Sequence, residues 1–409
     1  MNSSLAALNA LNFFMADVHG GLGPFLGVFL QARQWSPAQI GIVMTIGGIA
    51  GMVVTTPAGA LVDRTRYKRT IVVGTAIIIT VASLAILVKP DFAVVSGAQI
   101  ISGIAGAAIG PAIAAITLGL VHQTGFAHQL GRNEAFNHGG NVVAAALAGG
   151  IGYFTGLGAV FVILAVMALF SIAATYFIDP REIDHRAARG AGPRQDDGVA
   201  SFAVLLRSKE LMVLGATLTL FHLGNAAMLP LLGQAGVAHD GSNPSAFTAA
   251  TIIVAQTTMV PMALLAARLA QSQGYWTVFL LALIALPIRG ITACLVSGPL
   301  GLAPVQILDG VGAGILGVAV PGLVARILSG TGRVNAGLGA VMTLQGVGAA
   351  LSPAIGGMVA QRFGYPAAFL ALGVIAAIAL ALWLLARALM APACAKPPEK
   401  GAAEAKLAA

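Results

Sequence analysis

The chain is dominated by long apolar runs separated by short stretches that are polar or rich in glycine and proline. A helix needs roughly 20 mostly apolar residues to cross about 30 Å of hydrocarbon. Because the runs are continuous rather than alternating, they predict membrane-spanning helices and not the strands of a β-barrel. The predicted runs are 7–31, 38–62, 70–88, 92–121, 134–156, 159–178, 211–234, 246–270, 276–296, 302–328, 338–361 and 366–390. The predicted fold class is therefore an all-α membrane protein with twelve transmembrane helices.

The overall composition agrees with this interpretation. Of the 409 residues, 58% are apolar and 9% are charged, and the mean hydropathy is +0.90. Soluble domains carry about 25% charged residues, so this chain has too little charge to cover a water-facing surface. Cys294 and Cys394 are too few for a disulfide framework and have no partners at metal-ligand spacing. These figures exclude a soluble enzyme, a disordered chain and a coiled coil.

The basic residues concentrate on one side of the predicted spans. Of the 22 Lys and Arg residues, 18 lie in the loops that follow even-numbered spans, in the central loop or at the chain ends. The other side holds Arg33, Lys89 and Arg362, and Arg289 lies inside a span. The positive-inside rule then places both termini and the central loop in the cytoplasm, as expected for a multi-pass protein of a bacterial inner membrane. The net charge of +8 is thus a topology signal, and no nucleic-acid partner is expected.

The second half of the chain repeats features of the first at an offset of 207 residues. Pro37 and Pro244 precede the second and eighth runs, and Gln99 and Gln306 occupy matching places in the fourth and tenth. Two parallel six-helix bundles with a substrate site between them form a transporter architecture. The predicted parts are an N-terminal bundle, a cytoplasmic linker, a C-terminal bundle and a disordered cytoplasmic tail, at residues 1–178, 179–210, 211–390 and 391–409.

The loop after the second run contains a family motif. It reads GALVDRTRYK and resembles the signature G-x-L-A-D-R-x-G-R-K of the major facilitator superfamily, with matches at Gly59, Leu61, Asp63, Arg64 and Lys68. The resemblance extends over the whole chain through the twelve-span plan and implies two pseudo-symmetric six-helix bundles. It also implies a gate, in which Asp63 holds the outward-open state near the start of the eleventh helix, supported by Arg64 and Lys68.

Polar side chains inside the spans are few and are candidates for function. A charged group at the centre of a membrane helix costs at least about 2.5–3.5 kcal/mol on insertion scales, so its presence indicates a functional site. In the resembled superfamily, helices 1, 4, 7 and 10 line the central cavity. The polar residues of these four spans are Asn12, Asp17, His19, Gln99, His222, Asn225, Gln306 and Asp309.

Asp17 and His222 are the main candidates for proton coupling or substrate binding. At 1.5 Å per residue, Asp17 lies roughly 15 Å and His222 roughly 17 Å from the cytoplasmic ends of their spans. Both are therefore close to the midplane, on pseudo-symmetric helices of opposite bundles. A carboxylate and an imidazole placed there can bind and release a proton as the cavity alternates.

Arg289 and Asp309 form a second feature. Each stands about eight residues from the loop between the ninth and tenth spans, so a helical hairpin brings them to a similar depth. An unpaired buried charge is far more costly than a paired one, which predicts a salt bridge between them. The pair is either structural, a clamp for a substrate anion, or a proton-sensitive switch, since a guanidinium recognises carboxylate and phosphate well.

The predicted function is proton-coupled secondary active transport of a small organic molecule by alternating access. The mostly apolar cavity resembles that of drug:proton antiporters, which implies export by antiport. Two alternatives are a symporter or uniporter of an organic anion anchored by Arg289, and a divalent-metal carrier that uses Asp17 and His222. No Walker motif or nucleophile–base set occurs, so neither an ATP-driven pump nor an enzyme is expected. The expected partners are the substrate, protons and the lipid bilayer around a monomer, with no cofactor.

Overall fold

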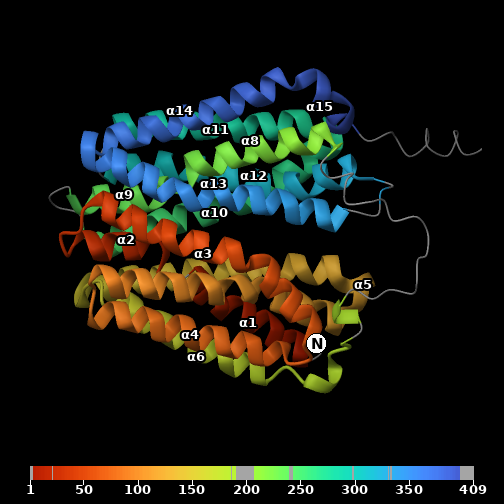
Figure 1. Ribbon diagram of the computed structural model, residues 1–409, viewed down its shortest axis with the longest axis horizontal. Coiled ribbons are helices and arrows are strands. Elements are labelled where there is room, and N and C mark those ends of the chain that lie inside the picture. Colours follow the sequence, from red (N-terminus) through yellow and green to blue (C-terminus); the bar gives the residue numbers. More distant parts are fainter. Residues whose placement is uncertain are drawn as a thin grey trace, which may run out of the picture.

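The structure is a computed structural model that describes residues 3–20, 22–185, 187–189, 207–238, 243–296, 299–329, 331 and 334–396. Regular secondary structure in these ranges consists of helices alone. The helices form two groups, one from the first half of the chain and one from the second, which lie side by side in Figure 1. The predicted all-α fold is confirmed.

The first group runs from the N-terminus to the central loop. Its elements are α1 (Ser3–Gly20), α2 (Gly23–Gln31), α3 (Pro37–Arg64), α4 (Lys68–Val88), α5 (Phe92–Thr155), α6 (Ala159–Tyr176) and the short turns η1 (Pro180–Glu182) and η2 (Ala187–Arg189). The second group contains α8 (Lys209–Asn225), α9 (Met228–Ala238), α10 (Pro244–Ser272), α11 (Tyr275–Leu295), α12 (Pro299–Ile327), α13 (Val334–Phe363), α14 (Tyr365–Leu385) and α15 (Arg387–Cys394).

Eleven segments of the described chain are long and apolar enough to cross a membrane, and they match eleven of the twelve predicted runs. The remaining run, 134–156, lies in α5. This element is two helices joined at His122, where φ is 52° and ψ is −175°. The second helix of α5, residues 123–155, carries Asn137, His138 and Asn141 and is therefore less apolar than the other spans. The structure agrees with the predicted twelve-span fold.

The helix starts repeat with the offset found in the sequence. α3 begins at Pro37 and α10 at Pro244, each with proline in the first turn. Ser36 caps α3 by accepting a hydrogen bond from the backbone of Gln39, and Asn243 caps α10 in the same way. A polar cap followed by proline is a strong start signal for a helix, because proline lacks the N–H that would otherwise remain unpaired.

The first and seventh predicted spans are each broken in the middle, whereas the sequence predicted continuous runs. α1 ends at Gly20 and α2 starts at Gly23, whose φ of 40° is accessible to glycine. In the second group, the break lies between Asn225 and Met228. There the hydroxyl of Ser352 on α13 accepts a hydrogen bond of 2.9 Å from the backbone N–H of Ala227. Hydropathy does not detect such breaks, because the residues at them are apolar or small.

Each group has its own apolar core. One cluster of buried side chains extends from Ala7 to Ile183 and also includes Ala249 of α10, and the other extends from Leu211 to Cys394. Ala249 joins the first cluster because α10 packs closely on the second helix of α5. A methyl group on Gly149 of that helix would collide with the side chain of Ala249.

The two groups pack tightly at one end of the molecule, which we name the closed end. Here Gly41 of α3 lies against the carbonyl of Pro353 on α13, and Gly357 of α13 lies against the carbonyl of Pro37. The backbone N–H of Ala354 also donates a hydrogen bond of 3.0 Å to the hydroxyl of Thr45. Any side chain at Gly41 or Gly357 would push the two helices apart.

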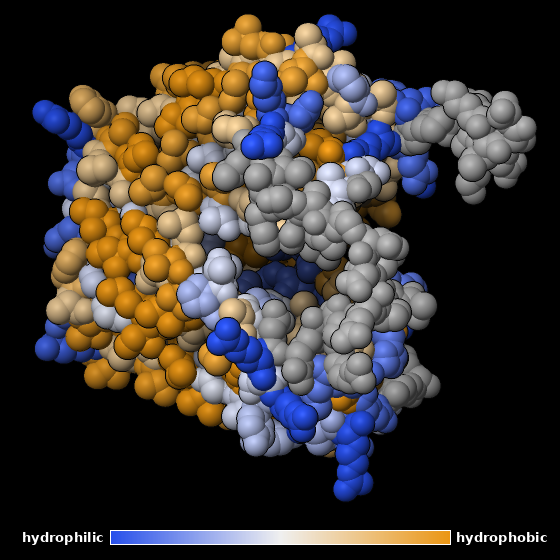
Figure 2. Space-filling model, turned by 45° about the vertical axis from the view of Figure 1, so that its right-hand side comes forward, coloured by the Kyte–Doolittle hydropathy of each residue, from blue (hydrophilic) through white to orange (hydrophobic). Residues whose placement is uncertain are grey.

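The opposite end, which we name the open end, holds the start of α4, the turns η1 and η2, and α15. Figure 2 brings this end forward and shows a hollow between the two groups, with hydrophilic side chains in its depth and apolar side chains over the outer face. The fold thus places a polar interior between two groups of helices that pack closely at the closed end.

Candidate functional site

A buried ion pair lies within the second group of helices. Arg289 of α11 is fully buried, and its Nη1 lies 2.8 Å from Oδ1 of Asp309 on α12, a side chain that is 14% exposed. The same nitrogen donates a hydrogen bond of 2.6 Å to Oδ1 of Asn225, the last residue of α8. The guanidinium therefore lies at the C-terminal end of α8, where the helix dipole favours a cation. The predicted salt bridge between Arg289 and Asp309 is confirmed.

Several buried polar atoms near these residues have no hydrogen-bond partner. They are Nε and Nη2 of Arg289, both amide heteroatoms of Gln306, and Nδ1 of His222. Gln306 precedes Asp309 by one turn of α12, and His222 precedes Asn225 by one turn of α8. An unpaired buried polar group costs about 1–3 kcal/mol. A cluster that carries this cost is a candidate for a site that changes its contacts during function. We refer to these five residues as the ion-pair cluster.

The first group contains a different arrangement, which we name the amide network. Nε2 of Gln129 lies 2.8 Å from Oδ1 of Asn9 and 3.0 Å from Oδ1 of Asn133. Nδ2 of Asn133 donates a hydrogen bond of 2.9 Å to the hydroxyl of Thr117. All four side chains are buried. The network connects α1 to both helices of α5 and contains no formal charge.

Beside the amide network lies a polar recess with a volume of about 210 Å³, between α1 and the two helices of α5. Its polar lining consists of Asn12, His19, Asn133, Glu134 and Asn137. Glu134 is exposed and precedes His138 by one helical turn. Nδ1 of His138 lies 2.6 Å from Oε1 of Gln256 on α10 in the second group. The side of the helix that carries Glu134 therefore faces the other group of helices.

Asp17, His19 and Gln99 lie apart from one another. Asp17 is partly buried in α1, its Oδ2 has no partner, and it is absent from the lining of the polar recess that His19 helps to form. Gln99 packs on α3, where a side chain at Gly47 would collide with its amide. No hydrogen bond or ion pair joins Asp17 to His222 among the described side chains. The two expected proton-coupling residues are thus on separate helices without direct contact.

The loop of the family motif is held together by its last residue. Lys68 is fully buried, and its Nζ donates hydrogen bonds of 3.0 Å to the carbonyl of Val62 and 2.9 Å to that of Thr65. A cation on the carbonyl end of α3 is favourable for the helix dipole. On α3, Gly59 is partly buried and Arg64 is exposed. Asp63 belongs to the last turn of α3, but its side chain lies outside the described residues, so its predicted role in gating stays a prediction.

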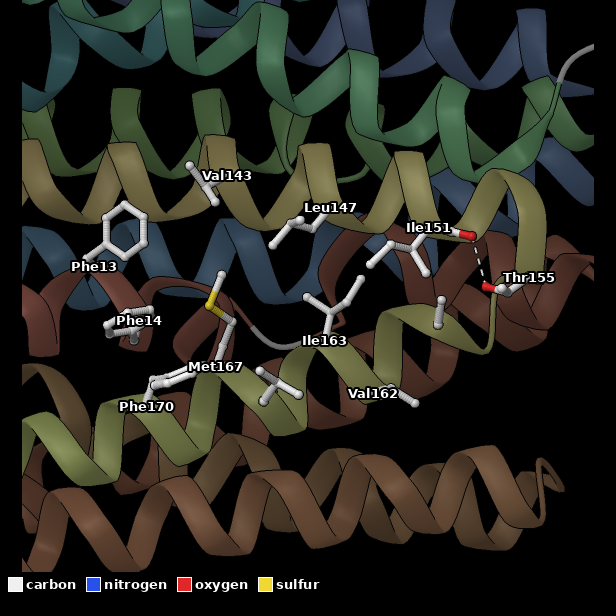
Figure 3. Close-up of a pocket in the computed structure, with 12 residues that line it drawn as sticks. Phe13, Phe14, Val143, Leu147, Ile151, Thr155, Val162, Ile163, Met167 and Phe170 are labelled. Atoms are coloured by element: carbon white, nitrogen blue, oxygen red, sulfur yellow. Dashed lines mark hydrogen bonds between the residues drawn. The ribbon is translucent and has the colours of Figure 1, made fainter.

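An apolar crevice of about 450 Å³ lies on the outer side of the first group, between α1, the second helix of α5 and α6 (Figure 3). Phe13 and Phe14 of α1 line one end, and Phe14 stacks on Phe170 of α6 with ring centroids 5.1 Å apart. Its wall includes exposed side chains such as Val162. The crevice therefore faces the surrounding hydrocarbon, and it is separate from the polar recess.

The sequence did not identify every polar residue that the structure brings together. Gln129, Asn133, Asn137 and Asn141 recur every four residues along the second helix of α5, a spacing that places them on one face. The four-residue spacing was the signal that would have found both the amide network and the polar recess.

Comparison with known proteins places these features in a family. The sequence profile described as the Major Facilitator Superfamily matches residues 4–303. Two uncharacterized MFS-type transporters of Mycobacterium tuberculosis, from strains CDC 1551 and H37Rv, are each 43% identical over 384 residues, which is 93% of this chain and 92% of theirs.

Solved structures with the same fold are much more distant in sequence. A mutant of the nucleoside transporter NupG superposes with a TM-score of 0.75 at 12% identity, covering 93% of this chain and 99% of that one. A bacterial homologue of the human lysosomal transporter Spinster, inward-facing and unoccupied, superposes with a TM-score of 0.75 at 16% identity, covering 97% of this chain and 98% of that one. At these identities the likeness extends to the fold alone.

Proposed function

Because the chain belongs to the major facilitator superfamily and is a membrane transporter of that family, we propose that it moves a small organic molecule by alternating access, coupled to protons. The proposed direction is export by antiport across a bacterial inner membrane. The observation that carries the proposal is the contrast between the closed end and the open end, with a polar hollow between them. In a second conformation, the groups would separate at the closed end and pack together at the open end. The same hollow would then open to the opposite side of the membrane.

The proposed orientation follows from the basic residues. The open end carries the four basic residues between positions 64 and 69, at the end of α3 and the start of α4. It also carries η1 of the predicted linker. Under the positive-inside rule this end faces the cytoplasm, and the conformation is inward-facing. In this proposal residues 1–178 and 211–390 are the two rocking bundles, joined by the cytoplasmic linker 179–210 and followed by the tail at 391–409.

Two groups are proposed to carry the proton. Asp17 is a partly buried carboxylate with an unpaired oxygen in the broken first span. Asp309 is the second, since protonation would remove its charge and release Nη1 of Arg289, which then keeps Asn225 as its remaining partner. The ion-pair cluster contains one further titratable side chain on these helices, the imidazole of His222 on α8. A change at Asp309 is thereby transmitted to three helices of the C-terminal bundle.

The geometry disfavours both alternative functions. Arg289 is fully buried and already holds Asp309 and Asn225, so it presents no exposed surface to a substrate anion. The described residues contain no group of three or more His, Cys, Asp or Glu side chains that could hold a metal ion. A small organic molecule that is neutral or cationic therefore fits the cavity better than an organic anion or a divalent metal.

The conformational part of the proposal is tested with two pairs of spin labels in lipid nanodiscs. One pair, Ala32→Cys with Ala238→Cys, reports on the closed end, and the other, Thr70→Cys with Gln271→Cys, reports on the open end; all four positions are exposed. Cys294 and Cys394 are first replaced by alanine. We expect a fraction of molecules in which the first distance is longer and the second is shorter. A single population in all conditions of pH would contradict alternating access.

Proton coupling is tested with the same labels at acidic and alkaline pH. If Asp17 is one of the two proton carriers, Asp17→Asn weakens the pH-dependent shift between the two populations, because the amide does not titrate while Asp309 still does. Glu182→Gln serves as the control, since this carboxylate is exposed on η1 and is absent from the lining of the polar recess. An unchanged pH response in Asp17→Asn excludes Asp17 from coupling, without affecting the conclusion about alternating access.

A further inference from the structure

The polar recess of the first group contains an unused carboxylate. Glu134 is the one formally charged residue among those that line the recess. It is exposed, and none of the described side chains forms a hydrogen bond or ion pair with it. Arg132, two positions earlier, points to a different side of the helix, because residues two apart do not share a face. The recess therefore presents a net negative charge to the hollow.

The surroundings of Glu134 favour recognition of a cation over simple solvation. Met15, Ile109 and Leu130 contribute apolar surface to the same recess. Charges interact more strongly beside apolar surface than in bulk water. On the opposite side of the molecule, Arg289 is buried and held by Asp309, so it does not supply a counter-charge to the hollow. A cation that enters from the open end finds its attractive partner in this recess.

The amides of the recess add hydrogen-bonding capacity without adding charge. Asn133 has both its oxygen and its nitrogen engaged in the amide network, which fixes the wall. Oδ1 of Asn137 accepts a hydrogen bond of 3.2 Å from Nδ2 of Asn141 and has a second lone pair, which can face a cation. The volume of about 210 Å³ is smaller than the roughly 300–1,000 Å³ that is usual for ligand sites, so the recess accommodates part of a molecule.

We infer that the polar recess binds the head group of an organic ammonium cation, with Glu134 as its counter-charge, while the rest of the molecule lies in the central hollow. The inference rests on the proposed transport function and names the substrate class of the same cavity. Glu134 is then the residue that selects cations over anions, and the ion-pair cluster on the opposite side is free to act in conformational coupling.

The test is direct binding of tritiated benzyltrimethylammonium to the purified full-length protein. This probe joins an ammonium head group to a small apolar ring. We expect saturable binding to the parent, weakened by about tenfold or more in Glu134→Gln, because the neutral amide removes the attraction between the carboxylate and the ammonium charge. Glu134→Asp is expected to retain part of the affinity, and Glu182→Gln all of it. Phenylpropionate, an anion of similar size, is expected not to compete.

Three results would overturn the inference: no saturable binding to the parent, equal affinity in Glu134→Gln, or competition by phenylpropionate as strong as by unlabelled cation. Melting temperatures of all variants establish that they are folded, and Glu134 is exposed, so its replacement is not expected to lower them. The spin-label distances separate this inference from the proposed function. If the Glu134→Gln variant still interconverts between the two conformations, the proposal of alternating access stands. Whether Glu134 recognises the cation is then decided by the binding data alone.

Discussion

The two groups of helices share an architecture and differ in how they treat buried polar side chains. In the first group, the amide network is neutral and its members Gln129 and Asn133 each make two hydrogen bonds to other side chains. In the second group, a charged pair is buried, and Gln306 and His222 nearby have unpaired atoms. The amide network leaves Nδ2 of Asn9 without a partner but is otherwise held by three hydrogen bonds between side chains. Such bonds make their surroundings rigid, whereas several unpaired atoms in one cluster are costly in any single conformation.

This difference separates two tasks within one fold. The amide network holds α1 and the two helices of α5 in a fixed relation and so preserves the shape of the polar recess. The ion-pair cluster connects α8, α11 and α12 by contacts that can be rearranged when one charge is neutralised. We expect the first group to bind the substrate and the second to change its contacts on protonation. The following variants test this division.

The largest effect is expected at Asp309. Asp309→Ala leaves the buried guanidinium of Arg289 without its counter-charge, and breaking a buried pair in this way costs about 3–5 kcal/mol. The measurement is the free energy of unfolding in detergent micelles. The double variant Arg289→Met with Asp309→Leu is the control, because removing both charges avoids the unpaired cation and should cost less than the single change. Equal losses in the two variants would show that packing, and not charge, dominates at this site.

The next effect compares one glutamine from each group. Gln129→Leu removes the donor of two hydrogen bonds and leaves Asn9 and Asn133 with unpaired buried oxygens, which we expect to cost about 1–3 kcal/mol. Gln306→Leu replaces a fully buried amide that has no partner, so its effect on stability should be close to zero or favourable. Unfolding in micelles again measures both. The contrast between the two groups would be wrong if Gln306→Leu proved the more damaging change.

A third effect concerns the closed end. Gly41→Ala places a methyl group against the carbonyl of Pro353 and should destabilise the packed arrangement by about 1–3 kcal/mol through overpacking. Spin labels at positions 32 and 238 should then report a larger fraction with separated ends. Gly74→Ala is a matched control in α4, since no atom lies within 4 Å of the added methyl group. A similar shift in both variants would argue against steric control by Gly41.

The smallest effect is expected for the hydrogen bond between the groups. His138→Ala removes the contact with Gln256, and a typical hydrogen bond contributes about 0.5–1.5 kcal/mol. The same labels at the closed end should show a small increase in the separated population. Asn141→Ala, one turn further along the helix, serves as the comparison because the hydrogen bond of Asn141 to Asn137 stays within α5. If His138→Ala leaves the distances unchanged, the bond does not stabilise this conformation.

Features of the site that follow from residue chemistry were predictable from the sequence, whereas features that depend on the rotation and packing of helices were not. The salt bridge between Arg289 and Asp309 was predictable, because an isolated buried charge is so costly that a partner at the same depth must be found. The surroundings of Lys68 and Glu134 were not predictable. Lys68 is buried against carbonyl groups at the end of α3, and its expected support of a gate stays a prediction. The place of Glu134 in the lining of the polar recess was not predicted either, since the sequence does not reveal how a helix is rotated.

The sequence by itself determined the membrane class, the number of spans and the repeat between the halves, because hydropathy and charge act over windows of about 20 residues and need no tertiary contact. Only the tertiary structure decided which polar groups meet, where the first and seventh spans break, and which end of the hollow is closed. These features depend on the rotation and the separation of helices, which are set by close packing between side chains distant in the chain. A sequence pattern shows which residues share one face of a helix, but the tertiary structure decides which other helix packs against that face.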